Sequence, residues 1–322
     1  MTQGAVRLDQ SRILITGGTG FLGRHLVRAL LAQGIAPDLI VRPATAKALQ
    51  AGPCPVHGAA LEDPAALAAL VHELRPEVIF HLGGFTSPAR DLTHSAEVIA
   101  VNYAATVALA NAALETGVAR FITTGTSEEY GRQAAPFAET LPERPLSPYS
   151  ASKAAASLWL RMLAGTHGLP MVLLRPFLVY GPGQPPPKLV PTAILAALAG
   201  EDFPMTSGAQ MRELTYVGDV VEGLLAAATR PSAVGETFNL GSGDERSVMS
   251  IVERIYALVG GPGHPRPGAL PDRGNDMQRY CADTKHSAEH LGWQAKTPLD
   301  QGLSETIAWA RSEGDRPVPL SL

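Results

Sequence analysis

Tyr149 and Lys153 stand four residues apart in the string YSASK, within a stretch that has a helical pattern. On a helix this spacing puts both side chains on one face, one turn apart. A phenol with an ordinary pKa of about 10 is a poor base at neutral pH, but a neighbouring ammonium favours its phenolate form. The pair is therefore predicted to carry out proton transfer.

A second chemical signal is the glycine-rich string ILITGGTGFLG, in which an apolar strand runs into a turn and then into a helix. Glycines permit a tight turn and a close backbone approach, while the start of the helix offers free N–H groups and a positive dipole end. Such a turn suits the pyrophosphate of a dinucleotide cofactor. The predicted cofactor-binding residues at this turn are Gly17, Gly20, Phe21, Leu22 and Gly23.

The first half of the chain has the pattern of a scaffold that could position these residues. Short apolar runs alternate with Ala- and Leu-rich helical stretches, which indicates βαβ units and an α/β fold with a doubly wound parallel sheet. The predicted strands are Arg12–Thr16, Asp38–Arg42, Val56–Leu61, Val78–Leu82, Arg120–Thr124 and Met171–Arg175, and the predicted helices are Phe21–Gln33, Pro64–Leu74, Ser95–Thr116 and Tyr149–Thr166.

The pattern changes after Arg175 into Gly- and Pro-rich text and turn-rich segments. We predict a cofactor-binding domain over residues 1–175 and a smaller, mainly substrate-binding α/β region over residues 176–322. A further strand-like run, Glu236–Leu240, indicates that residues 214–247 return to the first domain.

Composition excludes several classes of function. The 26 Lys and Arg against 30 Asp and Glu give a net charge of −4, so no polycationic surface for nucleic acid is expected. The chain begins without an apolar signal segment, and no run approaches about 18 unbroken apolar residues, so we expect a soluble cytoplasmic protein with no membrane partner. Cys54 and Cys281 lack metal-ligand spacing, and we expect reduced thiols and no metal site.

The spacing GxxGxxG after a threonine, with YSASK on the helix after the fifth predicted strand, resembles the extended branch of the short-chain dehydrogenase/reductase family. The resemblance implies a Rossmann sheet that holds NAD(P) and a C-terminal region that closes over a nucleotide-sugar. It assigns Tyr149 to exchange the O4 proton, and Lys153 to lower the pKa of Tyr149 and to grip the nicotinamide ribose. It also implies that Thr126, just after the fifth strand, orients O4.

Arg42 ends the second predicted strand, where a carboxylate would accept the adenosine ribose hydroxyls and select NAD. A cation at this position can pair with a 2′-phosphate, so the sequence predicts a preference for NADP over NAD. Asp38 lies at the other end of the same strand. Leu82, in an HLGG string that resembles the family's HLAA, completes the predicted cofactor site.

Glu128 and Glu129 follow Thr126 directly. Two carboxylates are costly to desolvate unless they serve a ligand or find partners, and two exposed loop acids are the alternative. The Thr-Ser-Glu triplet resembles that of GDP-mannose 4,6-dehydratases and UDP-glucuronate decarboxylases, in which the Glu works near C5 of the sugar. The longer string SEEYG is more similar to GDP-4-keto-6-deoxy-mannose reductases. Glu128 is therefore the fourth predicted catalytic residue.

The string RPFLVYGPGQ resembles the family's RPFNVYGPGQ, with Leu178 in place of an Asn that can hydrogen-bond a diphosphate or a sugar. Arg212 and Arg273 match the two arginines that meet the diphosphate in the family, and each guanidinium can donate a bidentate pair. Lys188, in PPPKLVP, is the third predicted substrate-binding residue.

The preferred activity is reduction of a nucleoside-diphosphate 4-keto-6-deoxyhexose by hydride transfer at C4. Other activities of the family remain open: a 4,6-dehydratase, in which Glu128 removes the C5 proton, and a 4-epimerase or decarboxylase. Leu178 leaves open a smaller, less polar ketone as substrate. A regulator that binds NAD(P) without turnover is the alternative from another class.

The resemblance also implies a homodimer. The ranges Ser95–Thr116 and Tyr149–Thr166 of two subunits would pack as a four-helix bundle. The residues suited to close helix approach are Ala104, Ala108, Ala112, Ala155 and Leu158.

Overall fold

The computed structural model describes residues 5–49, 52–86, 91–272 and 277–313. The strands are β1 (Ile13–Thr16), β2 (Asp38–Val41), β3 (Val56–Gly58), β4 (Val78–His81), β5 (Arg120–Thr124), β6 (Met171–Pro176), β7 (Leu178–Tyr180), β8 (Phe203–Pro204), β9 (Met211–Tyr216), β10 (Thr237–Leu240), β11 (Glu245–Ser247) and β12 (Pro265–Arg266). The α-helices are α1 (Phe21–Leu31), α2 (Pro43–Leu49), α3 (Pro64–Leu74), α4 (Ser95–Val98), α5 (Ala105–Thr116), α6 (Pro148–His167), α7 (Leu189–Leu198), α8 (Val217–Thr229), α9 (Val248–Val259) and α10 (Leu299–Glu313). Shorter helical segments are η1 (Leu8–Gln10), η2 (Ile99–Ala104), η3 (Ser127–Tyr130), η4 (Pro231–Ala233) and η5 (Ser287–Leu291).

Seven strands form the main sheet, in the order β10-β6-β5-β4-β1-β2-β3. Every neighbouring pair in this sheet is parallel, as the near-continuous apolar strands predict. The chain winds outward from β1 in one direction and from β4 in the other. The predicted doubly wound α/β class is confirmed, and the crevice where such sheets bind ligands lies beyond the carboxyl ends of β1 and β4.

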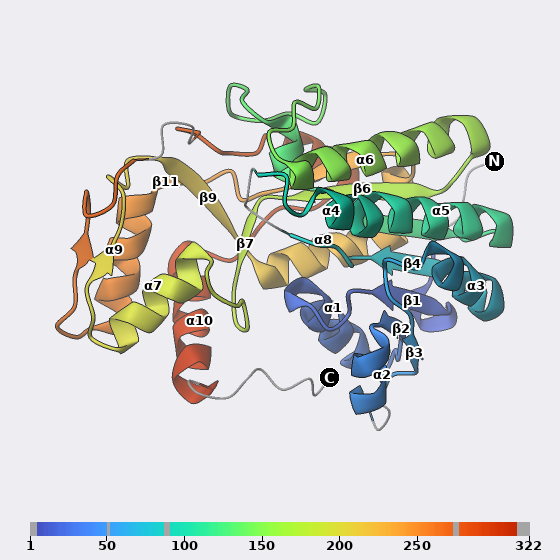
Figure 1. Cartoon of the computed structure of the whole chain (residues 1–322), viewed down its shortest axis with the longest axis horizontal. Coiled ribbons are helices and arrows are strands. Elements are labelled where there is room, and N and C mark those ends of the chain that lie inside the picture. Colours follow the sequence, from blue (N-terminus) through green and yellow to red (C-terminus); the bar gives the residue numbers. More distant parts are fainter. Residues whose placement is uncertain (1–4, 50–51, 87–90, 273–276, 314–322) are drawn as a thin grey trace.

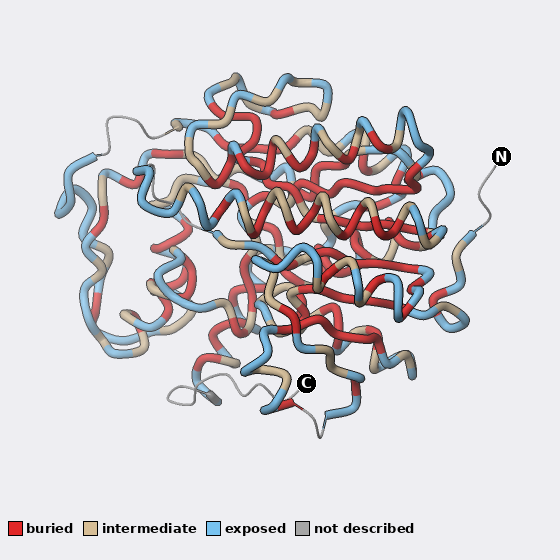
Figure 2. The backbone as a smooth tube through the Cα atoms, turned by 45° about the vertical axis from the view of Figure 1, so that its right-hand side comes forward, coloured by how far each residue is buried: buried red, intermediate tan, exposed pale blue. Residues whose placement is uncertain are grey.

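Helices cover both faces of the main sheet because side chains alternate along each strand. In β5, Phe121 packs into the apolar cluster made with α3, α5 and α6, whereas Ile122 packs into the cluster made with α1 and α8. Figure 1 shows α4, α5 and α6 on one side of the sheet, and Figure 2 shows the strands buried between the helical layers.

A smaller lobe follows β6. Its three-stranded sheet has the order β11-β9-β7, with β7 parallel and β11 antiparallel to β9. An apolar cluster that includes Val190 of α7, Ile251 of α9 and Leu303 of α10 fills this lobe. Within residues 214–247, β10 pairs with β6 in the main sheet, whereas β11 begins at Glu245 and belongs to the smaller sheet.

The range Ser95–Thr116 is one helical run, in which the π-helical segment η2 joins α4 to α5. By length and composition alone this run is long and apolar enough to cross a membrane, with a mean hydropathy of 1.4, although polar residues interrupt it. Half of that window is buried inside the protein, because α5 packs against α3 and α6.

Candidate active site

The glycine-rich turn joins β1 to α1, and its backbone packs closely against neighbouring backbone atoms. Gly17 has a left-handed backbone, with φ of +74°, and a Cβ atom there would lie 2.5 Å from the Gly83 nitrogen. A Cβ atom on Gly23 would lie 2.0 Å from the Gly17 carbonyl oxygen. Gly20 is the N-cap of α1 and no side chain caps this helix end, so its first N–H groups stay free for an anion. The turn therefore fits the pyrophosphate of a dinucleotide.

The other predicted cofactor residues border the same crevice. Phe21 and Leu22 form the first turn of α1 and are half-buried. Leu82 directly follows β4, and its backbone N–H donates to the carbonyl of Thr16 at the end of β1. His81 is buried between the hydroxyls of Thr16 and Thr106, and burial together with the Lys153 charge lowers its pKa to about 3. The uncharged imidazole therefore joins β1, β4 and α5.

Arg42 follows the last residue of β2 and is exposed. Asp38 begins the same strand and is buried, and its carboxylate accepts hydrogen bonds from Arg12 (3.2 Å) and His57 (2.7 Å). The carboxylate is thus at the far end of β2 and already has partners. In such folds the adenosine ribose of a dinucleotide lies at the carboxyl end of this strand. Arg42, and not Asp38, is at that end.

Tyr149 lies in the first turn of α6, and the Thr126 side chain lies close enough to act on its hydroxyl. Tyr149 is 9% exposed, and this burial raises the pKa of Tyr149 well above its ordinary value. The carboxylates of Glu128 and Glu129 shift the pKa in the same direction, and the Thr126 side chain opposes them. The structure thus brings the predicted hydroxyl pair together.

Lys153 lies one turn further along α6 and is buried. Its ammonium donates to the Thr124 carbonyl at 2.8 Å, and burial lowers the pKa of Lys153 to about 8 against the opposing charge of Glu129. A Cβ atom on Gly84 would lie 3.4 Å from the Lys153 nitrogen. The same Cβ atom would lie 3.0 Å from Oδ1 of Asn102, so the glycine of the HLGG string leaves room for both side chains.

Two buried side chains that the sequence analysis did not single out support this region. Asn102 accepts from the Phe85 backbone N–H at 2.8 Å and donates to the Ser152 hydroxyl at 3.0 Å, so it ties η2 to α6. The Tyr280 hydroxyl donates to the Ser127 hydroxyl at 2.7 Å. An Asn within an apolar helix was a usable signal, whereas nothing near Tyr280 in the sequence points to this contact.

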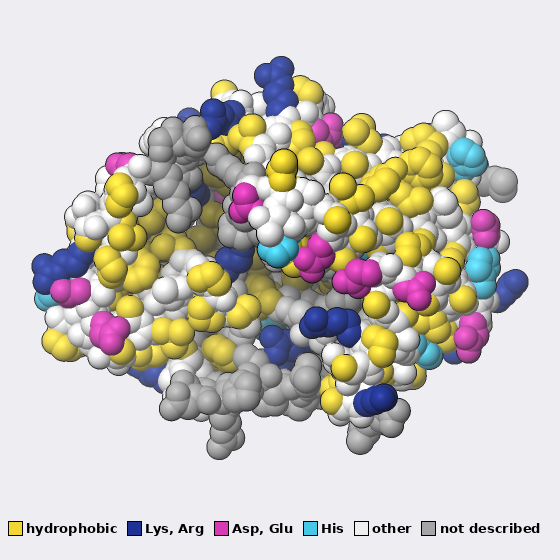
Figure 3. All heavy atoms as spheres, in the orientation of Figure 1, with side chains coloured by type: hydrophobic (Ala, Val, Ile, Leu, Met, Phe, Trp, Pro, Cys, Tyr) yellow, Lys and Arg dark blue, Asp and Glu magenta, His cyan; other side chains and the backbone are white. Residues whose placement is uncertain are grey.

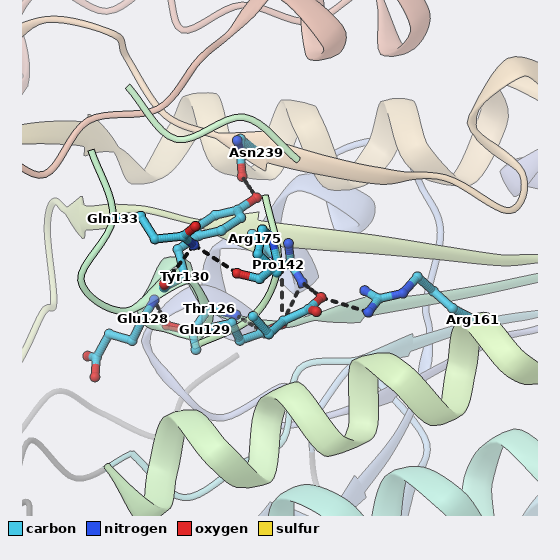
Figure 4. Close-up of polar contacts among 10 residues, drawn as sticks. Thr126, Glu128, Glu129, Tyr130, Gln133, Pro142, Arg161, Arg175 and Asn239 are labelled. Carbon is cyan, nitrogen blue, oxygen red and sulfur yellow. Dashed lines mark hydrogen bonds and ion pairs between the residues drawn. The ribbon is translucent and has the colours of Figure 1, made fainter. Parts of the chain in front are cut away.

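The structure separates the two adjacent glutamates (Figure 4). Glu129 is fully buried and forms an ion pair with Arg175 at 2.8 Å. Glu128 is exposed, and its side chain points away from that pair. Its charge nevertheless acts on the hydroxyls of Tyr149 and Tyr280. The two carboxylates therefore have different surroundings, and Glu128 is the exposed one.

The substrate side is built on β7 and β9. Leu178 pairs with Leu214 in parallel register, and Arg212, two residues before Leu214, lies on the same face. The Arg212 guanidinium donates to the backbone carbonyls of Met211 and Met277, both at 2.8 Å, and with Leu214 it lines a pocket that continues towards residues 295–299. Leu178 is 38% exposed, so an apolar surface stands where the family pattern has an amide.

Lys188, another predicted substrate residue, is not joined to this set in the described part of the chain. Lys188 is the exposed N-cap residue of α7, and no hydrogen bond within the described part of the chain ties its ammonium to the other predicted site residues. Arg273 lies outside the described residues. Figure 3 shows the hollow between the lobe of α7, α9 and α10 and the helices over the main sheet.

Comparison with known proteins gives one consistent family. The model of the NAD dependent epimerase/dehydratase family matches residues 13–241. The chain is 31% identical to the dTDP-glucose 4,6-dehydratase of Xanthomonas campestris pv. campestris (strain B100), over 92% of each protein. It is 32% identical to the UDP-glucose 4-epimerase of Mycolicibacterium smegmatis, over 94% of this chain and 99% of that protein.

A solved structure agrees with these relatives. The UDP-glucose 4-epimerase of Thermotoga maritima, determined with UDP-glucose, matches with a TM-score of 0.87 at 28% identity, over 94% of this chain and 100% of that chain. The family model covers most of the sheet domain, and the relatives align over nearly the whole chain. The protein therefore belongs to the NAD-dependent epimerase/dehydratase family, the nucleotide-sugar enzymes of the extended short-chain dehydrogenases/reductases.

Proposed function

We propose that the protein is a nucleoside-diphosphate-sugar 4,6-dehydratase that begins by oxidising C4 of the hexose. The observation that supports a dehydratase is the position of Glu128. Its exposed carboxylate lies on the turn that also supplies Thr126, and its charge raises the pKa of Tyr149. NAD(P), when bound, would supply a hydride acceptor and donor for the sugar. The dTDP-glucose 4,6-dehydratase relative favours dehydration, and neither relative named above is a 4-ketoreductase.

Tyr149, Thr126 and Lys153 handle the proton of the O4 hydroxyl. Tyr149 takes this proton while the hydride leaves C4, and Thr126 holds O4 through a hydroxyl that lies beside Tyr149. Because burial disfavours the phenolate, the reaction needs donors and positive charge beside Tyr149. The Lys153 ammonium, one turn along α6, is the buried cation on this helix face.

Glu128 then takes the proton from C5, which the new C4 ketone makes acidic. The electron pair left at C5 expels the C6 hydroxyl, which takes the proton held by Glu128 and leaves as water. The hydride would return to C6 from the bound cofactor. A proton from solvent adds to C5, and Tyr149 releases the O4 proton to solvent. The sugar loses one water, and no net oxidant or reductant is consumed.

Glu128→Gln is expected to lower the rate of dehydration at least 100-fold, because an amide cannot take the C5 proton. The measurement is mass spectrometry of the sugar product, which reports loss of one water from each of a panel of UDP-, GDP-, dTDP- and CDP-hexoses. Glu115→Gln is the control. It removes an exposed carboxylate that lies on α5, away from the turn of Glu128, and it should retain the wild-type rate.

A 4-ketoreductase is the second candidate, favoured by the SEEYG string. It would consume one reduced cofactor per 4-keto-6-deoxyhexose, and Glu128→Gln would leave that rate nearly unchanged. That pair of results would overturn the dehydratase assignment. Conversion of one hexose into its C4 epimer without loss of water would point to a 4-epimerase.

The nucleoside diphosphate is proposed to lie against Arg212, on the face that also carries Leu178. A ligand that binds only the native state raises its thermal midpoint, so stabilisation by one nucleoside diphosphate supports this placement. Stabilisation by the cofactor without any response to nucleotides would instead support the smaller, less polar ketone that Leu178 leaves open.

Arg42 is proposed to give a preference for NADP within this NAD-dependent family. A guanidinium can donate a charge-assisted bidentate pair to a 2′-phosphate, so Arg42→Ala should weaken NADP binding about tenfold or more and leave NAD binding nearly unchanged. Titration of both cofactors by calorimetry measures the two dissociation constants. Equal affinity of the wild type for the two cofactors would contradict the preference.

A homodimer is proposed through the outer faces of η2, α5 and α6. Ile99, Leu158 and Met162 are large exposed apolar side chains on these helices, and Figure 3 shows apolar side chains across this side of the molecule. The prediction that Ala112 belongs to this face is wrong, because it lies on the side of α5 that is buried in the core. Leu158→Lys should yield a monomer in light scattering, while Leu195→Lys on α7 should not.

A further inference from the structure

We infer that Glu129 is a positioning residue of the active site, which fixes Thr126 through its peptide N–H and is itself fixed by Arg175. This role rests on the proposed function of Thr126 in holding O4. Its physical basis is a chain of buried hydrogen bonds that joins two segments of the protein lying 46 residues apart (Figure 4).

The contact between Glu129 and Thr126 is a reciprocal cap at the start of η3. One carboxylate oxygen of Glu129, Oε1, accepts from the Thr126 backbone N–H at 2.8 Å. The Thr126 hydroxyl accepts from the Glu128 N–H at 3.3 Å, and the Thr126 side chain lies close enough to Tyr149 to lower the pKa of that phenol. Both the backbone and the hydroxyl of Thr126 are therefore held, and the direction of that hydroxyl depends on the Glu129 contact.

Arg175 holds the other carboxylate oxygen. Oε2 of Glu129 accepts from Arg175 Nε at 3.1 Å and from Nη2 at 2.8 Å, and both side chains have no exposed surface. Nη2 also donates to Glu143 at 2.6 Å, and the guanidinium lies 4.6 Å from the centre of the Tyr130 ring. Because a buried charge without its partner is strongly unfavourable, the ion pair with Arg175 holds the Glu129 side chain in place.

Gly125 supplies the space that this arrangement needs. A Cβ atom at position 125 would lie 2.4 Å from Oε1 of Glu129 and 3.4 Å from Cγ of Arg175. The first of these atoms is the end of a flexible side chain, so an alanine would displace the carboxylate without forcing the backbone to move. Gly125 and Glu129 therefore act as a matched pair in the string GTSEE.

The charge of Glu129 also affects the proton-transfer pair, Tyr149 and Lys153. Its carboxylate raises the pKa of both Tyr149 and Lys153, so its charge is close enough to influence each of them. Arg175 offsets this charge within the buried pair. Glu129 is thus placed to orient Thr126 without leaving an uncompensated negative charge beside Tyr149.

Glu129→Gln tests the inference, because an amide has one acceptor oxygen and cannot serve both Thr126 and Arg175. With NAD and the nucleotide-sugar that the wild type turns over, kcat should fall about 10- to 100-fold while KM stays within about threefold. Gly125→Ala should give the same fall in kcat with a similarly small change in KM. Glu139→Gln is the matched control, since Glu139 accepts one N–H, from Asn239, and its amide can keep that bond.

Hydrogen exchange gives a readout that needs no turnover. The peptide covering residues 125–131 should exchange faster in Glu129→Gln and in Gly125→Ala than in the wild type or in Glu139→Gln. Exchange unchanged in a folded Glu129→Gln protein, or kcat within threefold of the wild type, would overturn the inference. If Glu129→Gln does not fold, Gly125→Ala decides in its place by the same criteria. If the wild type turns over no nucleotide-sugar, the proposed function fails and exchange alone decides the positioning role.

Discussion

Tyr149→Phe is expected to lower kcat about 1000-fold, because it removes only the hydroxyl that exchanges the O4 proton. Phenylalanine keeps the ring that packs at the start of α6, so the fold and the cofactor turn should be unaffected. The measurement is kcat with the nucleotide-sugar identified in the panel, together with the dissociation constant for NAD. The binding constant should stay within a few-fold of the wild-type value.

The control for this result is Tyr256→Phe. Tyr256 also donates a hydrogen bond from its hydroxyl, to the Glu201 carbonyl at 2.7 Å, but it lies on α9 in the smaller lobe. Its loss should leave kcat within a few-fold of the wild-type value. Retention of more than a tenth of the wild-type kcat by Tyr149→Phe would mean that another group exchanges the proton.

Gly23→Ala is expected to destabilise the fold by about 3 kcal/mol and to abolish measurable NAD binding. The new methyl carbon would lie 2.0 Å from the Gly17 carbonyl oxygen and 2.8 Å from the Gly18 Cα. Both are backbone atoms of the cofactor turn, so relief requires α1 to move away from β1. That movement would disrupt the packing of Leu26 and Leu30 in the core.

Denaturant unfolding measures the loss of stability, and calorimetry measures NAD binding. Gly165→Ala on α6 is the matched control, because nothing lies within 4 Å of a Cβ atom there. An alanine at this exposed helical position should raise stability by up to about 1 kcal/mol. Normal NAD binding by Gly23→Ala would show that the turn does not need the close approach seen between α1 and β1.

Several elements could be predicted from local sequence because neighbouring residues alone determine them. The helix Pro64–Leu74 occurs as predicted: Asp63 caps it, Pro64 occupies its first turn, and Arg75 ends it in a left-handed conformation. The spacing of Tyr149 and Lys153 likewise placed both on one face of α6. Other predicted elements were longer than the structure has them. The helix predicted over Phe21–Gln33 ends at Leu31, just before Gly34 turns the chain with φ of +77°.

The substrate side was less predictable, since it depends on strand pairing. Nothing in the strings around Leu178 and Arg212 says that they share a face, because their segments lie far apart in the sequence. The register between β7 and β9 decides it. Asp38 shows the same limit. Its position at the start of β2 follows from the sequence, but its bonds to Arg12 and His57 arise because β2 pairs with β1 on one side and β3 on the other.

By itself, the sequence determined the α/β class, the glycine turn and the Tyr149–Lys153 pair, since each depends on periodicity or spacing within a few residues. The Thr-Ser-Glu resemblance singled out Glu128 as catalytic, but nothing in the sequence said how the surroundings of the adjacent Glu129 differ. Only the tertiary structure decided that Glu129 is buried against Arg175 and that Glu128 is exposed. The physical reason is that burial of a charge depends on a partner, and here β6 supplies that partner to a turn that follows β5.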